Sequence, residues 1–330
     1  MSGMEYRDKI YGQVKITEAV LLDLINSPEL QRLKDIDQAG YYEPFYPESK
    51  HNRFDHSVGV CLLLKKFGAS VEEQVAGLIH DVSHSAFSHA VDYVLSKGSE
   101  KEQNHQDNYF EEYVLSSNIP EILEKYGFDV GYILDETHFP LLETQLPDLC
   151  ADRIDYSLRG LLAYKVSGED KVRSILNSLT VENGRWIFKD FDSAYEYAKL
   201  FKTLNEGYYA AIETAVMFRR VGDYLKYALH RKYVTEEDLY TTDKNVLEKI
   251  NKNLENDAEL KKLWNRMNSN KGYEINSNNY DAKVYCKSRI VDPLCRHKGE
   301  VKRVSDAEPG WKGVVEQESK PKRYLIKFSD

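Results

Sequence analysis

Two short stretches decide how this chain folds: NRFDHSVGV at residues 52–60 and AGLIHDVSHSAFSH at residues 76–89. In each stretch a histidine interrupts an apolar helical pattern. Six of the nine histidines of the chain lie between His51 and His105. Histidine is a poor helix former and needs a polar partner when it is buried. This clustering therefore indicates a site of chemistry rather than ordinary packing.

The pair His80-Asp81 ends an apolar helical pattern that begins after Ser70. Two neighbouring polar side chains cannot share one face of a helix, but at a helix end both can converge on a cation. His56, 24 residues earlier on the preceding predicted helix, can supply a third ligand. A carboxylate from a distant part of the sequence, Asp152, is predicted as the fourth.

The helix predicted around Asp152 has one polar face. Asp152, Asp155, Tyr156 and Arg159 follow the spacing i, i+3, i+4 and i+7, so their side chains lie on the same side. The opposite side is apolar and carries Cys150, Ile154, Leu158 and Leu161. We expect the polar face to point into a cleft.

The remaining patterns predict a mainly α protein. Helices are expected at residues 54–67, 71–79, 86–96, 105–115, 119–126, 147–164, 168–179, 193–232 and 236–266. A β-hairpin is expected near residues 180–188, where Asn183-Gly184 suits a type I′ turn. Short strands are expected at residues 284–286, 301–304, 314–315 and 324–328. The predicted domains are a helical domain over residues 1–267, with its metal core at 51–160, and a small α+β C-terminal region over residues 268–330.

Composition excludes several classes of protein. The 330 residues include four cysteines without a CxxC pair, so neither a disulfide framework nor a thiolate zinc site is indicated. No apolar run approaches the roughly 20 residues that span a bilayer, and we expect a cytoplasmic protein with no membrane partner. The net charge of −9 argues against strong nucleic-acid binding. Residues 296–330 differ from the rest, with nine Lys/Arg against six Asp/Glu.

The two opening stretches, together with ADRIDY at residues 151–156, resemble the HD superfamily of metal-dependent phosphohydrolases. More narrowly they resemble its deoxynucleoside-triphosphate triphosphohydrolase branch. The IYG sequence at residues 10–12, PELQRL at residues 28–33 and the Asn183-Gly184 hairpin match as well. The resemblance spans about residues 8–250 and implies an HD-domain helical core.

The resemblance implies a role for individual residues. The metal ligands would be His56, His80, Asp81 and Asp152. A catalytic dyad would consist of His105 oriented by Asp92. His84 and His89 match histidines on the phosphate side, which makes His84 a further catalytic candidate and His89 a substrate-binding one. The other substrate contacts implied are Arg53, Arg153 and Tyr156 on the triphosphate and Gln38 on the sugar or base.

The chain departs from this family pattern at two positions. Tyr208-Tyr209 is followed by Ala210-Ala211, where many relatives have His-Lys. Gly160 stands where deoxynucleotide-specific relatives can place an aspartate that senses the sugar 3′-hydroxyl. Both departures concern substrate recognition, and neither concerns the metal ligands.

The leading functional prediction is a hydrolase that cleaves (deoxy)nucleoside triphosphates to nucleoside and tripolyphosphate. The first alternative is an HD-type phosphatase or phosphodiesterase that acts on nucleoside monophosphates or another small phosphate ester. The second is a non-catalytic nucleotide-binding regulator.

Two histidines and two aspartates suit Mn, Fe, Co, Ni or Zn as the resident divalent metal. Magnesium is a further candidate, as the ion that accompanies the substrate phosphates. The predicted partners are the nucleotide substrate, further copies of the chain in a homo-oligomer, and an effector nucleotide. The basic C-terminal region is a candidate for either the oligomer interface or the effector site.

Overall fold

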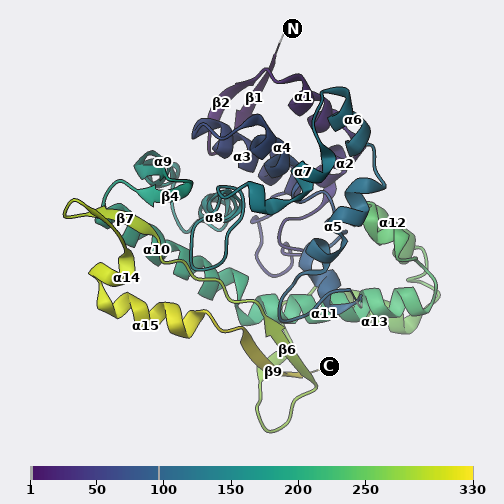
Figure 1. The fold of residues 1–330 in the computed structure, drawn as a ribbon. Helices are drawn as coiled ribbons and strands as arrows, with labels where there is room; N and C mark the ends of the chain where they lie inside the picture. Colours follow the sequence, from purple (N-terminus) through teal and green to yellow (C-terminus); the bar gives the residue numbers. More distant parts are fainter. Residues whose placement is uncertain (1–2, 96, 330) are drawn as a thin grey trace.

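Helices make up most of the chain in the computed structural model, which describes residues 3–95 and 97–329 (Figure 1). The prediction of a mainly α protein is confirmed. The α-helices are α1 (Ala19–Asn26), α2 (Pro28–Arg32), α3 (Arg53–Lys66), α4 (Val71–Ile79), α5 (His105–Leu115), α6 (Ile119–Lys125), α7 (Val130–Leu134), α8 (Ala151–Ala163), α9 (Glu169–Ser178), α10 (Phe191–Leu204), α11 (Ile212–His230), α12 (Asp243–Asn251), α13 (Ala258–Met267), α14 (Val304–Ala307) and α15 (Pro309–Glu318). Shorter helical turns are η1 (Leu33–Asp35), η2 (Ser88–Tyr93), η3 (Glu136–His138), η4 (Asn205–Tyr209) and η5 (Glu237–Tyr240).

Helix α3 is the centre of the core. It is buried from Val58 to Leu64, and it packs against α4 on one side and α8 on another. The approach to α8 depends on Gly59, since a Cβ there would lie 2.2 Å from Asp155 Oδ1 and 2.0 Å from an Arg159 guanidinium nitrogen. The glycine therefore lets the polar face of α8 reach the helix turn that carries His56.

Side-chain caps start the helices that matter for the site. Asn52 Oδ1 accepts a hydrogen bond from the Asp55 amide at 2.8 Å, and Ser70 Oγ accepts one from the Glu73 amide at 3.1 Å. Such caps satisfy amides that have no partner inside the helix. They set where α3 and α4 begin, and so they place His56 and His80 along the two helices.

Three small sheets surround the helices of the described chain. The strands are β1 (Met4–Asp8), β2 (Gly12–Ile16), β3 (Leu179–Glu182), β4 (Arg185–Phe188), β5 (Tyr273–Ile275), β6 (Ala282–Cys286), β7 (Leu294–His297), β8 (Glu300–Arg303) and β9 (Lys322–Phe328). The strand orders are β1-β2, β3-β4-β7-β8 and β5-β9-β6. The predicted hairpin is present as β3 and β4, which pair antiparallel with Glu182 opposite Arg185.

Several local features differ from the sequence prediction. The helix expected at residues 86–96 is the short turn η2, and the helices expected at 193–232 and 236–266 are each divided into shorter elements. The N-terminal hairpin of β1 and β2 was not predicted. Only the last residue of each strand, Asp8 and Ile16, is buried, so these short strands lack the apolar alternation that marks a half-buried strand. Val314 and Val315 were predicted as a strand, and this was wrong, since they lie in α15. Pro309 stands in the first turn of that helix, and Trp311 Nε1 donates to the Val291 carbonyl at 3.1 Å. These two anchors outweigh the β preference of two adjacent valines.

The predicted boundary at residues 267 and 268 falls between α13 and β5. The residues beyond it pack onto the helical part: β7 pairs parallel with β4, and β6 lies against α11 (Figure 1). Arg220 of α11 donates to the carbonyls of Ser269 and Lys271. The stretch between β6 and β7 contributes Lys287, Ser288 and Arg289 to the lining of the large cavity described below.

Candidate active site

Four predicted metal ligands meet where α3, α4 and α8 come together. His56 comes from the first turns of α3, His80 and Asp81 follow the end of α4, and Asp152 begins α8. His56 Nε2 lies 2.9 Å from Asp152 Oδ1 and 3.2 Å from His80 Nε2. Asp81 Oδ1 lies 3.5 Å from His80 Nε2, and Asp81 Oδ2 lies 3.7 Å from His56 Nε2. Ligand atoms of His56, His80 and Asp152 thus lie within 4.8 Å of one another, and Asp81 borders this group through its contacts with both histidines.

The orientation of the two imidazoles fits a cation between them. His56 Nδ1 donates to Asp155 Oδ2 at 2.8 Å, and His80 Nδ1 donates to the Gly77 carbonyl at 2.8 Å. With both Nδ1 protons used in this way, both Nε2 lone pairs point into the same space and repel each other unless a positive charge lies there. Metal–ligand bonds of about 2.1 Å would separate neighbouring donor atoms by about 3.0–3.4 Å. The observed spacings fit a metal held by His56, His80, Asp81 and Asp152.

Carboxylates dominate the electrostatics of this cluster. Burial acts to lower the pKa of His80, but the charges of Asp81 and Asp152 raise it to about 10. Burial alone would raise the pKa of Asp152, yet hydrogen bonds from His56 and His80 hold it well below its usual range. The cluster therefore attracts positive charge strongly, whether as protons or as a metal ion.

A buried network behind the cluster holds His56 in place. Asp155 accepts hydrogen bonds from His56 Nδ1, from Arg159 Nε at 2.7 Å and from Tyr11 Oη at 2.8 Å. Arg159 also reaches Asp8 at 2.8 Å, at the end of β1. The N-terminal hairpin is therefore connected to His56, a predicted metal ligand, through two charged side chains. Of the polar face predicted on α8, Asp152 and Tyr156 line the cavity, whereas Asp155 and Arg159 support it from behind.

Comparison with known proteins agrees with this geometry. Residues 53–160 match the family model of the HD domain. The chain is 38% identical over 247 residues to the uncharacterized protein YdhJ of Bacillus subtilis, with 74% of each chain covered. It is 34% identical over 222 residues to the metal-dependent phosphohydrolase cns2 of Cordyceps militaris, covering 66% of this chain and 64% of that protein. The chain belongs to the HD family of metal-dependent phosphohydrolases.

More distant relatives and solved structures extend this picture of the HD protein. Human deoxynucleoside triphosphate triphosphohydrolase SAMHD1 is 32% identical over 160 residues, which cover 41% of this chain and 25% of SAMHD1. The crystal structure of a phosphohydrolase from Bacteroides thetaiotaomicron matches with a TM-score of 0.73 at 15% identity, covering 99% of this chain and 100% of the other. A hypothetical protein from Aquifex aeolicus matches with a TM-score of 0.74 at 18% identity, covering 99% and 96%. These two structural matches show the fold.

The HD cluster opens into a cavity of about 980 Å³. All the predicted substrate-side residues contribute to its lining, namely Gln38, Arg53, His84, His89, Arg153 and Tyr156. Lining residues that sequence reasoning did not assign include Gln103, Tyr164, Tyr209, Lys287 and Arg289. No local pattern marks the last two, because only the fold brings the stretch after β6 to the cavity.

Arg53 is the most firmly held cation of the HD site. Its three guanidinium nitrogens donate to Asp81 Oδ2 at 2.5 Å, to Ser88 Oγ at 2.8 Å and to the Gln38 carbonyl at 2.9 Å. It is 2% exposed. Arg153, which is 7% exposed, also makes three contacts, to the Asp148 carbonyl at 2.5 Å, to the Thr144 carbonyl at 3.2 Å and to Glu143 at 3.3 Å. Both arginines are therefore held in place beside the His/Asp cluster.

Of the three histidines that follow the His-Asp pair, His84 and His89 line the cavity and His105 does not. His84 Nε2 lies 3.3 Å from Asp81 Oδ1, and the ring of His89 stands perpendicular to that of His84 at 5.1 Å. His89 Nδ1 lies 3.3 Å from Asp92 Oδ2. Both rings face the cavity.

The dyad expected between His105 and Asp92 is not formed through the imidazole. Asp92 Oδ1 accepts from the backbone amide of His105 at 2.9 Å, while His105 Nε2 lies 2.9 Å from Tyr240 Oη. The cause is that His105 is the first residue of α5, so Asp92 meets the unpaired amide of the helix start. In this arrangement Asp92 acts on His89 rather than on the ring of His105.

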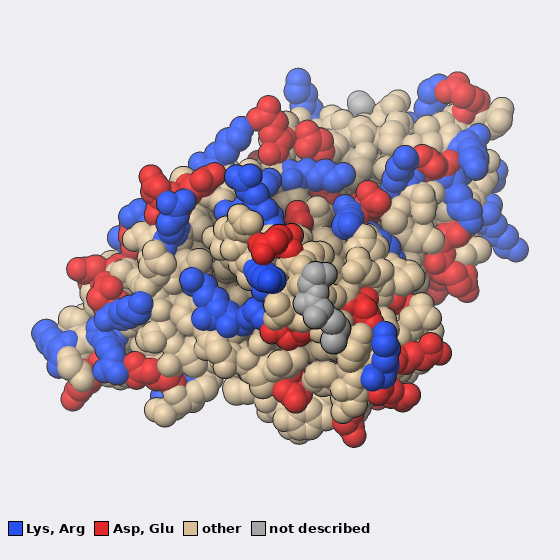
Figure 2. Space-filling view, turned by 90° about the horizontal axis from the view of Figure 1, so that it is seen from above, with Lys and Arg blue, Asp and Glu red and all other residues tan. Residues whose placement is uncertain are grey.

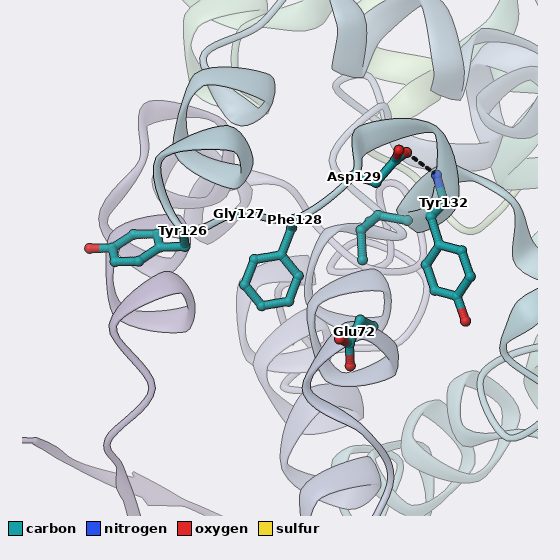
Figure 3. Close-up of a pocket in the computed structure, with 7 residues that line it drawn as sticks. Glu72, Tyr126, Gly127, Phe128, Asp129 and Tyr132 are labelled. Atoms are coloured by element: carbon teal, nitrogen blue, oxygen red, sulfur yellow. Dashed lines mark hydrogen bonds between the residues drawn. The ribbon is translucent and has the colours of Figure 1, made fainter.

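A second group of potential ligand atoms, Glu143, Cys150 and Asp152, shares Asp152 with the main cluster. Its Glu143 already accepts from Arg153, and its Cys150 caps α8. A separate hollow of about 360 Å³ lies between α4 and the loop after α6, lined by residues that include Glu72, Phe128 and Tyr132 (Figure 3). It contains no histidine. The predicted site residues His80, Asp81, His84 and Asp152 line the large cavity instead.

Charges on the outer surface are mixed. Lys and Arg side chains alternate with Asp and Glu over the face seen from above (Figure 2). Among the described residues, no helix combines the length and the apolar character needed to cross a bilayer.

Proposed function

We propose that this HD phosphohydrolase cleaves (deoxy)nucleoside triphosphates to nucleoside and tripolyphosphate. The observation that supports the proposal most is the joint placement of the His/Asp cluster and of Arg53, Arg153 and Tyr156 on the lining of one large cavity. A monophosphate needs few cationic partners, whereas a triphosphate presents oxygens along an extended chain. Arginine suits such oxygens because its planar fork can bind two of them at once.

The reaction adds water to the α-phosphorus, breaks its bond to the nucleoside oxygen and delivers one proton to that oxygen. A divalent metal bound by His56, His80, Asp81 and Asp152 would polarise a phosphoryl oxygen and activate a water molecule. Arg53, fixed on three sides, is placed to balance charge on the phosphate without reorganising.

We assign the exchange of protons to His84 and His89, because their rings line the cavity. Asp92 orients His89 through the 3.3 Å contact with its Nδ1. In this proposal the role of His105 is structural: its backbone amide donates to Asp92 and holds that carboxylate in place. Gln38 is the candidate for a sugar or base contact, since its Oε1 is buried without a hydrogen-bond partner among the described residues.

The alternative is an HD phosphatase or phosphodiesterase for monophosphates or other small esters. The observation that favours it lies at Gly160, which offers no side chain to a sugar. Tyr209 Oη lies 2.7 Å from the place where a Cβ at Gly160 would be, so the tyrosine fills that space. A phosphate ester that is recognised without a contact to the sugar would need no side chain at this position.

One incubation distinguishes the two. Purified protein is mixed with Mn²⁺ or Mg²⁺ and with a panel of dNTPs, NTPs and NMPs, and the products are separated by anion-exchange chromatography. We expect nucleoside and tripolyphosphate in equal amounts from at least one triphosphate. Orthophosphate from monophosphates, with triphosphates untouched, would overturn the proposal in favour of the alternative. A ligand-induced rise in melting temperature without turnover would point to a nucleotide-binding regulator instead.

The variant His80→Ala tests the site itself. It should lose bound metal and turnover together, because it removes one of the two opposed Nε2 atoms. His230→Ala is the matched control, since His230 is exposed at the end of α11. Retained turnover in His80→Ala would refute the assignment of the metal site. The metal's identity, the homo-oligomer, the effector nucleotide and the cellular location stay predictions.

A further inference from the structure

The stretch that follows β6 brings two cations to the cavity from the C-terminal region. Lys287 and Arg289 both line it, although they lie more than 130 residues from the last metal ligand in the sequence. Neither takes part in a salt bridge within 4.0 Å in the described part of the chain, whereas Arg53 and Arg153 are each paired with a carboxylate. Two cations in a cavity with no close carboxylate partner leave charge available for an anion.

The backbone of this stretch is firmly anchored. Asn205, fully buried in η4, accepts a hydrogen bond from the Arg289 amide at 2.8 Å through Oδ1. Its Nδ2 donates to Ser288 Oγ at 2.9 Å and to Glu318 at 3.2 Å. The next two residues, Ile290 and Val291, are fully buried. The segment is therefore built into the fold, and the two side chains are presented from a rigid base.

Electrostatic effects place these cations close to the residues already assigned to the substrate. Burial raises the pKa of Tyr156, and the positive charges of Arg153 and Arg289 oppose that rise. Burial lowers the pKa of Lys287, and the charge of Arg289 lowers it further. The negative charges of Asp107, Glu102 and Glu143 act in the opposite direction and raise the pKa of Lys287, although none of them forms a salt bridge with it. Bringing two like charges together in a partly buried wall is unfavourable unless an anion joins them.

Gln103 is an independent sign that a ligand belongs at this wall. Its side chain is 3% exposed, and its Nε2 has no hydrogen-bond partner among the described residues. Its Oε1 accepts from Arg289 at 3.4 Å. A buried amide donor without a partner costs about 1–3 kcal/mol, which a bound acceptor would offset. Its backbone adopts a left-handed φ of 51°, a strained value of the kind that clusters at ligand sites.

We propose that Lys287, Arg289 and Gln103 form a second anion subsite, which binds phosphate groups of the substrate other than the one held at the metal. The proposal rests on the function proposed above and names the substrate class more narrowly: an ester with at least two linked phosphates. The subsite supplies two positive charges and an amide donor to phosphate oxygens. The C-terminal region is thus part of the substrate site.

Binding of inorganic polyphosphate tests the subsite without requiring turnover. The affinities of tripolyphosphate and orthophosphate are measured by calorimetry for the full-length protein loaded with Mn²⁺ and for Arg289→Gln and Lys287→Gln. We expect each variant to bind tripolyphosphate about tenfold more weakly, since each loses a charge-assisted contact. Orthophosphate affinity should change by less than about twofold. Arg323→Gln is the matched control, an exposed arginine on β9, and should bind both anions as the wild type does.

Two further readouts separate a binding role from a structural one. Arg289→Lys keeps the charge and should recover part of the tripolyphosphate affinity. With a triphosphate substrate, Arg289→Gln should raise KM about tenfold with a smaller change in kcat. Unchanged tripolyphosphate affinity in both Gln variants would overturn the subsite while leaving the proposed function intact. If the wild type cleaves only monophosphates and does not prefer tripolyphosphate, the proposed function fails as well.

Discussion

The two walls of the cavity are charged in different ways. On the helical wall, α3, α4 and α8 carry His56, His80 and Asp152, whose donor atoms lie 2.9–3.5 Å apart. On the C-terminal wall, Lys287 and Arg289 project from an irregular stretch and have no carboxylate partner within 4.0 Å in the described chain. The first arrangement needs a cation at its centre, and the second needs an anion from outside. On the proposals above, the helical wall would hold the metal and the phosphate that reacts, and the C-terminal wall would bind the remaining phosphate groups of the substrate.

The largest expected effect concerns the support of the helical wall. Asp155→Asn should weaken metal binding about 10- to 100-fold, because the amide can no longer orient His56 and balance Arg159 at once. Metal affinity measured by calorimetry checks this. Asp55→Asn is the matched control, since Asp55 lies beside His56 on α3 but bonds to Tyr6 and Asn52. Equal metal affinity in Asp155→Asn and the wild type would show that the buried network of Asp155 does not contribute to metal binding.

An intermediate effect is expected from loosening the C-terminal wall alone. Asn205→Ala removes the anchor of Ser288 and Arg289 and should lower the free energy of unfolding by about 1–3 kcal/mol. It should also raise KM for a polyphosphate substrate while metal affinity stays unchanged. Urea denaturation and steady-state kinetics give the two values, and Asn253→Ala, which bonds only within its own turn, is the control. A loss of metal affinity in Asn205→Ala would show that the two walls are not independent.

The smallest expected effect is a pH dependence next to the helical wall. Asp243 accepts from the amides of Asp37 and Phe87. Burial, together with the charge of Asp37, raises the pKa of Asp243 to about 7, although the two amide hydrogen bonds and Lys50 act to lower it. Between its unfolded pKa near 4 and this value, the folded state binds more protons than the unfolded state. Its contribution to stability therefore falls as pH rises through that window.

Asp243→Asn removes this titration, so the stability of the wild type relative to the variant should decrease by at most about 1.4 kcal/mol per pH unit up to about pH 7. Urea denaturation at pH 5, 6 and 7 measures the difference. The exposed Asp170→Asn should show no such trend. A constant difference between the wild type and Asp243→Asn across this range would contradict the assigned titration.

Local signals were sufficient for much of the helical wall. The helix start at Ser70 and the turn at Asn183-Gly184 depend on contacts within three residues, so the sequence next to them is enough to predict them. The spacing of Asp152 and Tyr156 on α8 also placed both side chains on the cavity side. The same reasoning failed for Val314-Val315, where the contact between Trp311 and Val291 decides for a helix.

The sequence by itself determined the mainly helical class, because helix periodicity and end signals depend on short-range geometry. Its resemblance to the HD family indicated the family, and the spacing of His56, His80, Asp81 and Asp152 indicated the His/Asp cluster. Only the tertiary structure decided that Asp155 holds His56, that Asp92 meets an amide rather than the ring of His105, and that Arg289 reaches the cavity. The contacts of Asp155 with His56 and of Asn205 with Arg289 join residues 99 and 84 positions apart. At such separations no local pattern specifies a partner, since the approach depends on how whole helices pack.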